Sequence, residues 1–320
     1  MGRYILKRLL WIIPVVLGVT ILIFVLMHFV PGDPATIILG SEATEADLIA
    51  KREQLGLTRP LWQQILNYME RVFLHFDFGN SYVTGNSITQ ELLGRFPRTA
   101  LLGFMSMVLM LIVGIPLGIT AAVHQNGWAD RICMVIALLG VSVPAFWLGL
   151  LLVLFFSLRL GWLPPSGIGG LQYFILPTIA NSFGGIASLA RQSRSSMLEV
   201  IRSDYVTTAR AKGISNRSVI YGHALPNALI PIITVAGSQL AHAFGGSVII
   251  ENVFSIPGIG SYMVQSVNNR DYIAVTGSVI FMAITFSLVM LLVDIGYAFI
   301  DPRIKAQYTT GKKKKVKRHE

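Results

Sequence analysis

One short polar stretch is the most informative part of this sequence: Asp204-Tyr205-Val206-Thr207-Thr208-Ala209-Arg210-Ala211-Lys212-Gly213, with Leu225-Pro226 twelve residues further on. Residues 204–212 contain neither Gly nor Pro and include several strong helix formers. Glycine readily adopts the left-handed conformation that ends a helix. The pattern therefore predicts a helix that ends at Gly213, and a second short helix from about Asn216 to Leu225. Two short helices joined at a glycine would form a compact knob that a partner protein can bind.

Composition places this knob in a membrane protein. The chain has 320 residues, of which 53% are hydrophobic and only 13% charged, far from the averages of soluble proteins. Several apolar runs are each about long enough, as helices, to cross the roughly 30 Å hydrocarbon layer of a bilayer. These runs cover residues 9–30, 100–123, 132–158, 173–189, 228–250 and 275–300. We therefore expect an all-α integral membrane protein with six transmembrane helices.

The distribution of Lys and Arg predicts the orientation of these helices. The N-terminus, the 124–131 loop, the 191–225 loop and the C-terminal tail carry 3, 1, 6 and 8 basic residues. The opposite face carries 8, which its 10 acidic residues outnumber. Because cytoplasmic flanks collect positive charge, both termini and the 191–225 loop are expected in the cytoplasm. The net charge of +10 follows largely from this asymmetry and from the Lys-rich tail, which is expected near anionic lipid, so no nucleic-acid partner is needed.

The chain divides into segments of different character. The first apolar run is too long for a typical signal-peptide core and no small-residue cleavage site follows it, which predicts an uncleaved signal-anchor. The next segment has helical patterns at about 45–55 and 61–74 and is expected to form a lid on the outer face. The predicted divisions are an N-terminal transmembrane helix at 1–30, an extracytoplasmic lid at 31–97, a transmembrane core at 98–300 that includes the 191–225 loop, and a basic cytoplasmic tail at 301–320.

The polar stretch resembles the coupling loop of the permease subunits of ATP-binding-cassette (ABC) importers. That motif reads Glu-Ala-Ala, three residues, Gly, nine residues, Ile, one residue, Leu-Pro. Here Thr207-Thr208-Ala209 takes the place of the triplet, Gly213 that of the glycine, and Leu225-Pro226 that of the end. Thr207 stands where the motif has Glu and His223 where it has Ile. The resemblance therefore covers the helix-Gly-helix geometry but not a salt bridge from position 207.

Further blocks along nearly the whole chain resemble the dipeptide, oligopeptide and nickel permease family, first-subunit type. They are Val30-Pro31-Gly32-Asp33-Pro34-Ala35, Leu55-Gly56-Leu57-Thr58-Arg59-Pro60-Leu61, Asp77-Phe78-Gly79-Asn80-Ser81, Arg95-Phe96-Pro97-Arg98-Thr99, Gly114-Ile115-Pro116-Leu117-Gly118, Ser142-Val143-Pro144-Ala145-Phe146-Trp147-Leu148-Gly149, Gly161-Trp162-Leu163-Pro164, Asn252-Val253-Phe254-Ser255-Ile256-Pro257-Gly258-Ile259-Gly260, Arg270-Asp271-Tyr272, Leu292-Val293-Asp294 and Asp301-Pro302-Arg303.

The family resemblance implies a type I ABC importer permease in a bacterial or archaeal cytoplasmic membrane. Its implied partners are a homologous second permease, two ATPase subunits and an extracytoplasmic solute-binding protein. The implied substrate is a di- or oligopeptide, with glutathione or a nickel chelate as alternatives. ATP-driven closure of the ATPases would move both coupling loops and reopen the helices toward the binding protein. The residues expected to serve ATPase coupling are Asp204, Tyr205, Ala209, Arg210, Ala211, Lys212, Gly213, Leu225 and Pro226.

The sequence offers no catalytic centre of its own. It has no Gly-x-x-x-x-Gly-Lys-Ser/Thr phosphate loop, so energy for active transport must come from a partner. An intramembrane hydrolase would need a nucleophile and a base on facing helices, whereas Ser238, His242 and Ser247 lie on one predicted helix. A passive channel would leave the coupling loop without a role. Copurification with an ATPase would distinguish an ATP-driven transport subunit from a passive channel. We expect a transport subunit with no enzymatic activity, no metal site and no cofactor.

The fifth apolar run is interrupted by polar and small residues. Polar groups that face lipid without a partner are costly, so this helix is expected to face the bundle interior or a water-filled path. Gln239, His242 and Ser247 are the candidates for the translocation pathway. Close helix packing through small residues is the alternative explanation. Asp294, near the inner end of the sixth run, is expected to pair with a basic loop residue.

Overall fold

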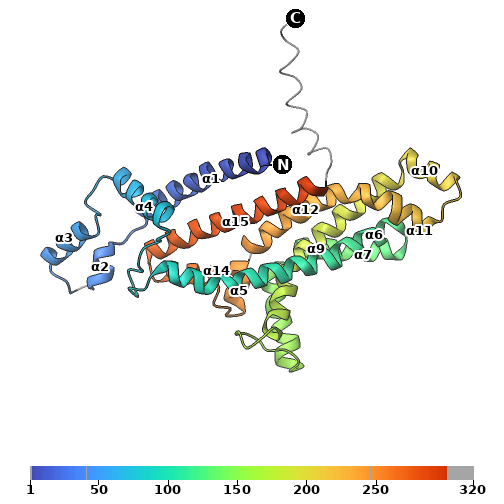
Figure 1. Ribbon diagram of the computed structural model, residues 1–320. Coiled ribbons are helices and arrows are strands. Elements are labelled where there is room, and N and C mark those ends of the chain that lie inside the picture. Colours follow the sequence, from blue (N-terminus) through green and yellow to red (C-terminus); the bar gives the residue numbers. More distant parts are fainter. Residues whose placement is uncertain (1, 41, 246, 301–320) are drawn as a thin grey trace, which may run out of the picture. The chain divides into compact units, whose positions relative to one another are not determined.

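The structure is a computed structural model that describes residues 2–40, 42–245 and 247–300. Within these residues every regular element is a helix, apart from one isolated bridge between Asn80 and Ser87 (Figure 1). The expected all-α fold is confirmed. The elements are α1 (Gly2–Phe29), α2 (Pro34–Leu39), α3 (Glu45–Gln54), α4 (Leu61–His75), α5 (Ile88–Leu109), η1 (Met110–Gly114), α6 (Ile115–Val123), α7 (Trp128–Ser142), α8 (Ala145–Leu152), η2 (Val153–Arg159), α9 (Gln172–Ile201), α10 (Asp204–Ala211), α11 (Asn216–Ser218), η3 (Val219–Ala224), α12 (Leu225–Gly245), α13 (Ser247–Val253), α14 (Ile259–Asn268) and α15 (Tyr272–Ile300).

Several of the described helices are long and apolar enough to cross a membrane. There are 5 such helices, or 6 if one bent pair counts as a single span. The five are Ile5–Phe29, Ile88–Val123, Gln172–Ile201, Asn216–Gly245 and Tyr272–Gly296. Each contains most of an apolar run that the sequence predicts as a transmembrane helix. The predicted lid helices at 45–55 and 61–74 are also present, as α3 and α4.

The third apolar run is not the straight helix that we expected. It forms α7 and the α8–η2 helix, which are bent by 105° at the break between Ser142 and Ala145. Val143 precedes Pro144 and is extended, with φ −85° and ψ 120°. Proline disfavours the helical region for the residue before it and cannot donate a backbone hydrogen bond, so the helix stops there. Hydrophobicity alone did not reveal this break.

The fifth run also differs from the expectation. The predicted second short helix, 216–225, is not separate, because α11, η3 and α12 continue into one another from Asn216 to Gly245. Residues 219–224 form a π-helix, in which one turn is widened. The predicted membrane run ends at residue 250, but α12 ends at Gly245 and α13 begins at Ser247.

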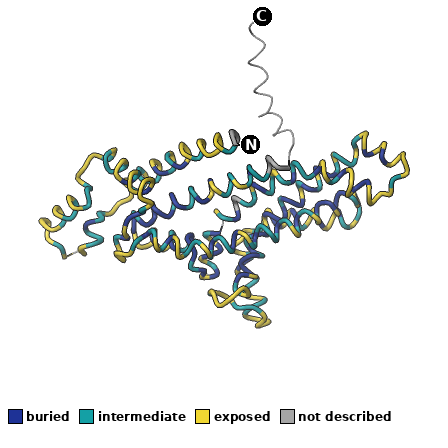
Figure 2. The backbone as a smooth tube through the Cα atoms, viewed as in Figure 1, coloured by how far each residue is buried: buried dark blue, intermediate teal, exposed yellow. Residues whose placement is uncertain are grey.

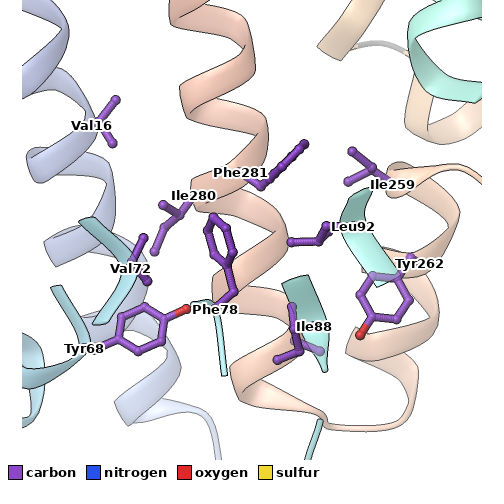
Figure 3. Packing of buried hydrophobic residues seen from close by; sticks show 11 residues of the cluster. Val16, Tyr68, Val72, Phe78, Ile88, Leu92, Ile259, Tyr262, Ile280 and Phe281 are labelled. Atoms are coloured by element: carbon purple, nitrogen blue, oxygen red, sulfur yellow. The ribbon is translucent and has the colours of Figure 1, made fainter. Parts of the chain in front are cut away.

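The chain forms two compact units, each with its own core. Unit 1 comprises residues 1–8, 100–256 and 288–320, and unit 2 comprises residues 9–99 and 257–287. The predicted lid, 31–97, thus belongs to unit 2 together with most of α1, α14 and the first half of α15. Figure 3 shows the core of unit 2, in which Phe78, Ile88 and Leu92 lie beside Ile280 and Phe281 of α15.

A buried carboxylate ties the loop before α5 to the start of α15 within unit 2. Asp271 accepts hydrogen bonds from the Ser81 hydroxyl and from the backbone N–H groups of Tyr82 and Ala274, the latter two at 3.2 and 3.3 Å. Its position before α15 also suits a negative charge, because the N-terminus of a helix carries partial positive charge. This cluster joins segments that lie 190 residues apart.

Unit 1 is built around α9, which packs against α6, α7, α8 and α12. Figure 2 shows buried residues along much of α9, whereas α1 is largely exposed. Gly118 of α6 allows the closest approach: a Cβ there would lie 2.3 Å from the Ala190 carbonyl oxygen and 2.5 Å from Ser193 Cβ. Any side chain at position 118 would force α6 away from α9. The helix that leads into the polar stretch is therefore held on several sides.

Candidate coupling site

The polar stretch folds as predicted in its first half. α10 covers Asp204–Ala211, and Gly213 follows in the left-handed region with φ +80°. The N–H of Gly213 donates to the Arg210 carbonyl at 3.0 Å, which closes the turn. Asp204 lies in the first turn and Arg210 in the last, so both charges complement the helix dipole.

One face of α10 is buried and anchors the knob. Val206 and Ala209 belong to an apolar cluster of unit 1. The other buried members of this cluster are Ile119, Ala122, Met197, Val219, Ile220, Ala224, Ala228 and Ile232. Ala209 was expected to contact a partner, but it packs inside the chain, and we assign it to anchoring instead. α10 is thereby held against the end of α9 and the start of the α11–α12 helix.

The opposite face of α10 is exposed and basic. The predicted residues that lie on this exposed surface are Asp204, Tyr205, Arg210, Ala211, Lys212, Gly213 and Pro226, while Leu225 is half-buried. Tyr205 exposes 46% of its surface and is therefore open to contact by a partner. The geometry is a rigid knob with an aromatic side chain and two cations directed outward.

Sequence reasoning did not single out two exposed residues of the helix that follows Gly213. Tyr221 exposes 56% of its surface and Arg217 is also exposed, four residues earlier on the same helix. Their i, i+4 spacing places both on one face of the helix. This spacing was visible in the sequence and could have identified them.

A buried ion pair braces α9 just before the knob. Asp130 of α7 accepts hydrogen bonds from both Nε and Nη2 of Arg194 on α9, the latter at 2.8 Å, and from the backbone N–H of Asn126 at 2.9 Å. The Asp130 side chain is 5% exposed and that of Arg194 24%. Arg202 adds a longer, exposed contact of 3.3 Å to Gln125. The 124–131 loop is thus tied to the helix that leads into α10.

The candidate pathway residues are distributed unevenly. Gln239 is half-buried on α12, and Ser247 is fully buried at the start of α13. The side chain of His242 lies outside the described residues. The Ser247 hydroxyl lies 2.9 Å from the Phe244 carbonyl and 3.2 Å from Glu251 Oε1.

Two further polar residues near this region escaped the sequence analysis. Glu251 is fully buried, although it follows directly after the apolar run that we expected to end at residue 250. Asn181 of α9 donates to the Ser106 hydroxyl at 3.0 Å and to the Ala243 carbonyl at 3.2 Å, joining α9 to α5 and α12.

Asp294 pairs with Arg8 at 3.0 Å, as expected for a structural role, although Arg8 comes from α1 rather than from a loop.

Ser238 was considered above as the nucleophile of an intramembrane hydrolase. The Ser238 hydroxyl donates to the Val235 carbonyl at 2.8 Å, which is the usual internal bond of a serine in a helix. Within the described part of the chain no cluster of three His, Cys, Asp or Glu residues could hold a metal ion.

Comparison with protein families agrees with this geometry. Residues 114–306 match the family described as the inner membrane component of binding-protein-dependent transport systems, and residues 1–103 match its N-terminal domain. The chain belongs to this family. The permease is therefore a subunit of an ABC importer of the peptide, nickel and glutathione group, and a multi-pass inner membrane protein.

Individual relatives cover almost the full length of this permease. It is 43% identical over 305 residues to the glutathione transport system permease protein GsiC of Salmonella choleraesuis (strain SC-B67), covering 95% of this chain and 99% of that one. It is 42% identical over the same length to GsiC of Escherichia coli (strain K12), with the same coverage.

Among solved structures, the permease resembles an inward-facing form of the MetNI methionine ABC transporter. The TM-score is 0.54 at 19% identity, over 66% of this chain and 96% of that chain. At this identity the similarity concerns the fold alone, and it confirms the expected type I importer permease fold.

Proposed function

We propose that this permease forms half of a translocation pathway with a homologous second permease, and that an ATPase subunit binds the exposed face of α10. The observation that carries this proposal is the anchored knob. Val206 and Ala209 fix α10 to the apolar cluster, so that Tyr205, Arg210 and Lys212 face outward. A rigidly held helix can transmit the movement of a soluble partner to the transmembrane helices behind it. The family supports the presence of ATPase and solute-binding partners.

The ion pair between Asp130 and Arg194 fits this role. α9 runs from the membrane to the knob, and the pair fixes it to the start of α7. A force applied to α10 would then move α7 and α9 together. Coupling requires that ATP and the loaded binding protein favour the same conformation of the permease.

The proposed orientation places the knob and both termini in the cytoplasm. Support comes from the 6 basic residues of the 191–225 loop and the 3 at the N-terminus. ATP hydrolysis is assigned to the partner subunits, because the sequence contains no phosphate loop. We propose that the chain has no enzymatic activity of its own.

The proposed substrates are peptides, with glutathione, itself a tripeptide, as the first to be tested. The relatives at 42–43% identity are named as glutathione transport permeases. A nickel chelate remains the alternative within the family. The ligand of the cognate binding protein would distinguish these substrates most directly.

Charge reversal tests the proposed contact with the ATPase. We expect the double substitution Arg210→Glu, Lys212→Glu to lower transport-coupled ATPase stimulation about tenfold, because it places two acids where two exposed cations stand. The measurement is ATPase activity of the purified complex with and without loaded binding protein.

The matched control is Lys314→Glu, Lys315→Glu in the basic tail, outside the described residues, where charge reversal should have little effect. If the Arg210→Glu, Lys212→Glu complex assembles and couples like the wild type, these cations serve only membrane topology. The knob would then act through shape alone.

A further inference from the structure

Unit 2 contains a cavity that the coupling mechanism does not use. It has a volume of about 670 Å³ and is formed by the end of α1, the turn before α2, the end of α3 with the loop after it, α4, the 82 region and the first turns of α15. Small-molecule sites typically measure about 300–1,000 Å³. The cavity thus has the size of a site for a small solute, and it lies in the unit that contains the lid.

Positive charge is in excess around this cavity. Its lining includes three arginines, Arg52, Arg59 and Arg71, and two acids, Asp33 and Glu53. Arg52 already forms two ion pairs. Its Nη2 lies 2.9 Å from Oδ2 of Asp33, and its Nη1 lies 3.2 Å from Oε1 of Glu45.

The Asp33 carboxylate is already fully occupied. It also accepts hydrogen bonds from the Ala35 N–H at 3.2 Å and the Thr36 hydroxyl at 3.1 Å. Burial alone would raise its pKa, but the hydrogen bonds, above all those from Arg52, outweigh burial and hold the pKa of the Asp33 carboxyl below its ordinary value. Asp33 is therefore charged at neutral pH and neutralises Arg52 rather than the other two arginines.

The other two arginines are free to bind an anion. Arg59 forms no ion pair within the described part of the chain. Among the described residues, the one ion pair of Arg71 is a long contact of 3.8 Å to Asp77, with both side chains about half exposed. Guanidinium groups bind carboxylates through two parallel hydrogen bonds, which makes them suited to the free carboxylate of a small solute.

Aromatic and apolar side chains form part of the remaining wall, beside polar residues such as Gln64 and Asn67. The lining includes Phe24 and Met27 of α1 and the tyrosines Tyr68, Tyr82 and Tyr272, and the rings of Phe24 and Tyr68 are in contact, with centroids 5.6 Å apart. Within the described residues the hydroxyl of Tyr68 is buried without a hydrogen-bond partner, which is uncommon for a native donor. Figure 3 shows Tyr68 at the edge of the unit 2 core. Apolar walls with a few convergent polar groups are typical of sites for organic solutes.

We infer that this cavity is a binding site for a peptide-sized solute with a free carboxylate, held by Arg59 and Arg71 against the aromatic wall. The inference rests on the proposed function, since it supplies the permease with a substrate contact of its own. Selectivity would then reside partly in the permease and not only in the binding protein.

Direct binding tests this site. The permease with its partner ATPases is placed in nanodiscs of zwitterionic lipid, without binding protein or nucleotide, and binding is measured by saturation-transfer NMR. The probes are glutathione, trialanine and trialanine amide, which lacks the free carboxylate. We expect the double variant Arg59→Gln, Arg71→Gln to bind the two carboxylate probes about tenfold more weakly than the wild type.

Two further variants separate cavity from surface charge. Asn67→Trp places a large side chain at an exposed position of the lining and should also weaken binding. Lys51→Gln removes a cation of the same segment that does not line the cavity, and should bind normally. The amide should bind the wild type about as weakly as trialanine binds the double variant.

The outcomes are distinct. Three results would each overturn the inference. They are no binding of the probes to the wild type, equal binding by the double variant and Lys51→Gln, and displacement of the probes by anionic lipid in the nanodisc. The last result would assign the cavity to a lipid headgroup. ATP-dependent uptake by the complete wild-type transporter is measured in parallel. If uptake is normal while binding fails, only the inference is wrong, whereas absent uptake of every family substrate counts against the proposed function.

Discussion

The Gly213→Val permease should insert into the membrane normally but lose more than about nine-tenths of ATP-dependent uptake. Gly213 has φ +80°, a region that costs an ordinary L-residue roughly 1–2 kcal/mol and a β-branched residue more. A Cβ at this position would meet nothing within 4 Å, so the effect would come from the backbone and not from a clash. The chain would leave the left-handed turn, and α10 would lose its angle to the α11–α12 helix. Uptake into proteoliposomes, normalised to inserted protein, measures the effect.

Two controls isolate the role of the backbone at this turn. Gly213→Asn should retain most activity, because asparagine tolerates the left-handed region better than other residues with a side chain. Gly222→Val lies in the nearby π-helix, where a Cβ also meets nothing within 4 Å, and it has no positive φ. Normal uptake by a well-expressed Gly213→Val permease would refute the assignment of the turn.

Removing Arg194 should strongly destabilise unit 1. Arg194→Ala would leave the Asp130 carboxylate, 5% exposed, without its cation. Breaking a buried ion pair from one side costs about 3–5 kcal/mol, far more than the pair itself contributes. We expect a clear fall in the thermal midpoint of the detergent-solubilised permease, together with lower ATPase coupling.

A matched variant and a compensating pair check this explanation. Arg202→Ala removes an exposed contact near the same end of α9 and should cost less than about 1 kcal/mol. The double variant Asp130→Leu, Arg194→Met removes both charges and should recover much of the stability. A thermal midpoint for Arg194→Ala equal to that of Arg202→Ala would show that the ion pair does not brace α9.

Local features of the fold could be predicted from the sequence. The apolar runs, the helices α3 and α4, and the end of α10 just before Gly213 follow from residue propensities within a few turns of chain. The exposed cations of the knob follow from the same pattern. These features depend on neighbours in sequence, which a single chain reveals.

Long-range contacts could not be predicted in this way. Asp130 and Arg194 are 64 residues apart, and Ser81 and Asp271 are 190 apart, so no local pattern joins them. The burial of Ala209 depends on which face of α10 meets Ile220 and Ala228, and this depends on the packing of three helices. The break at Val143-Pro144 was visible as a proline, but several other prolines lie inside continuous helices of this chain.

The central claim is that an ATPase subunit binds the exposed face of α10. Site-specific crosslinking tests it most directly, in a Cys133→Ala background that removes the one native cysteine. Tyr205→Cys is treated with a maleimide crosslinker in the assembled complex, beside Trp62→Cys of the lid as a control with 60% exposure. The account predicts a covalent adduct between the permease and an ATPase subunit from position 205 and none from position 62. Two results would contradict it. One is equal crosslinking to the ATPase from both positions, and the other is no crosslink from position 205 in a complex that transports.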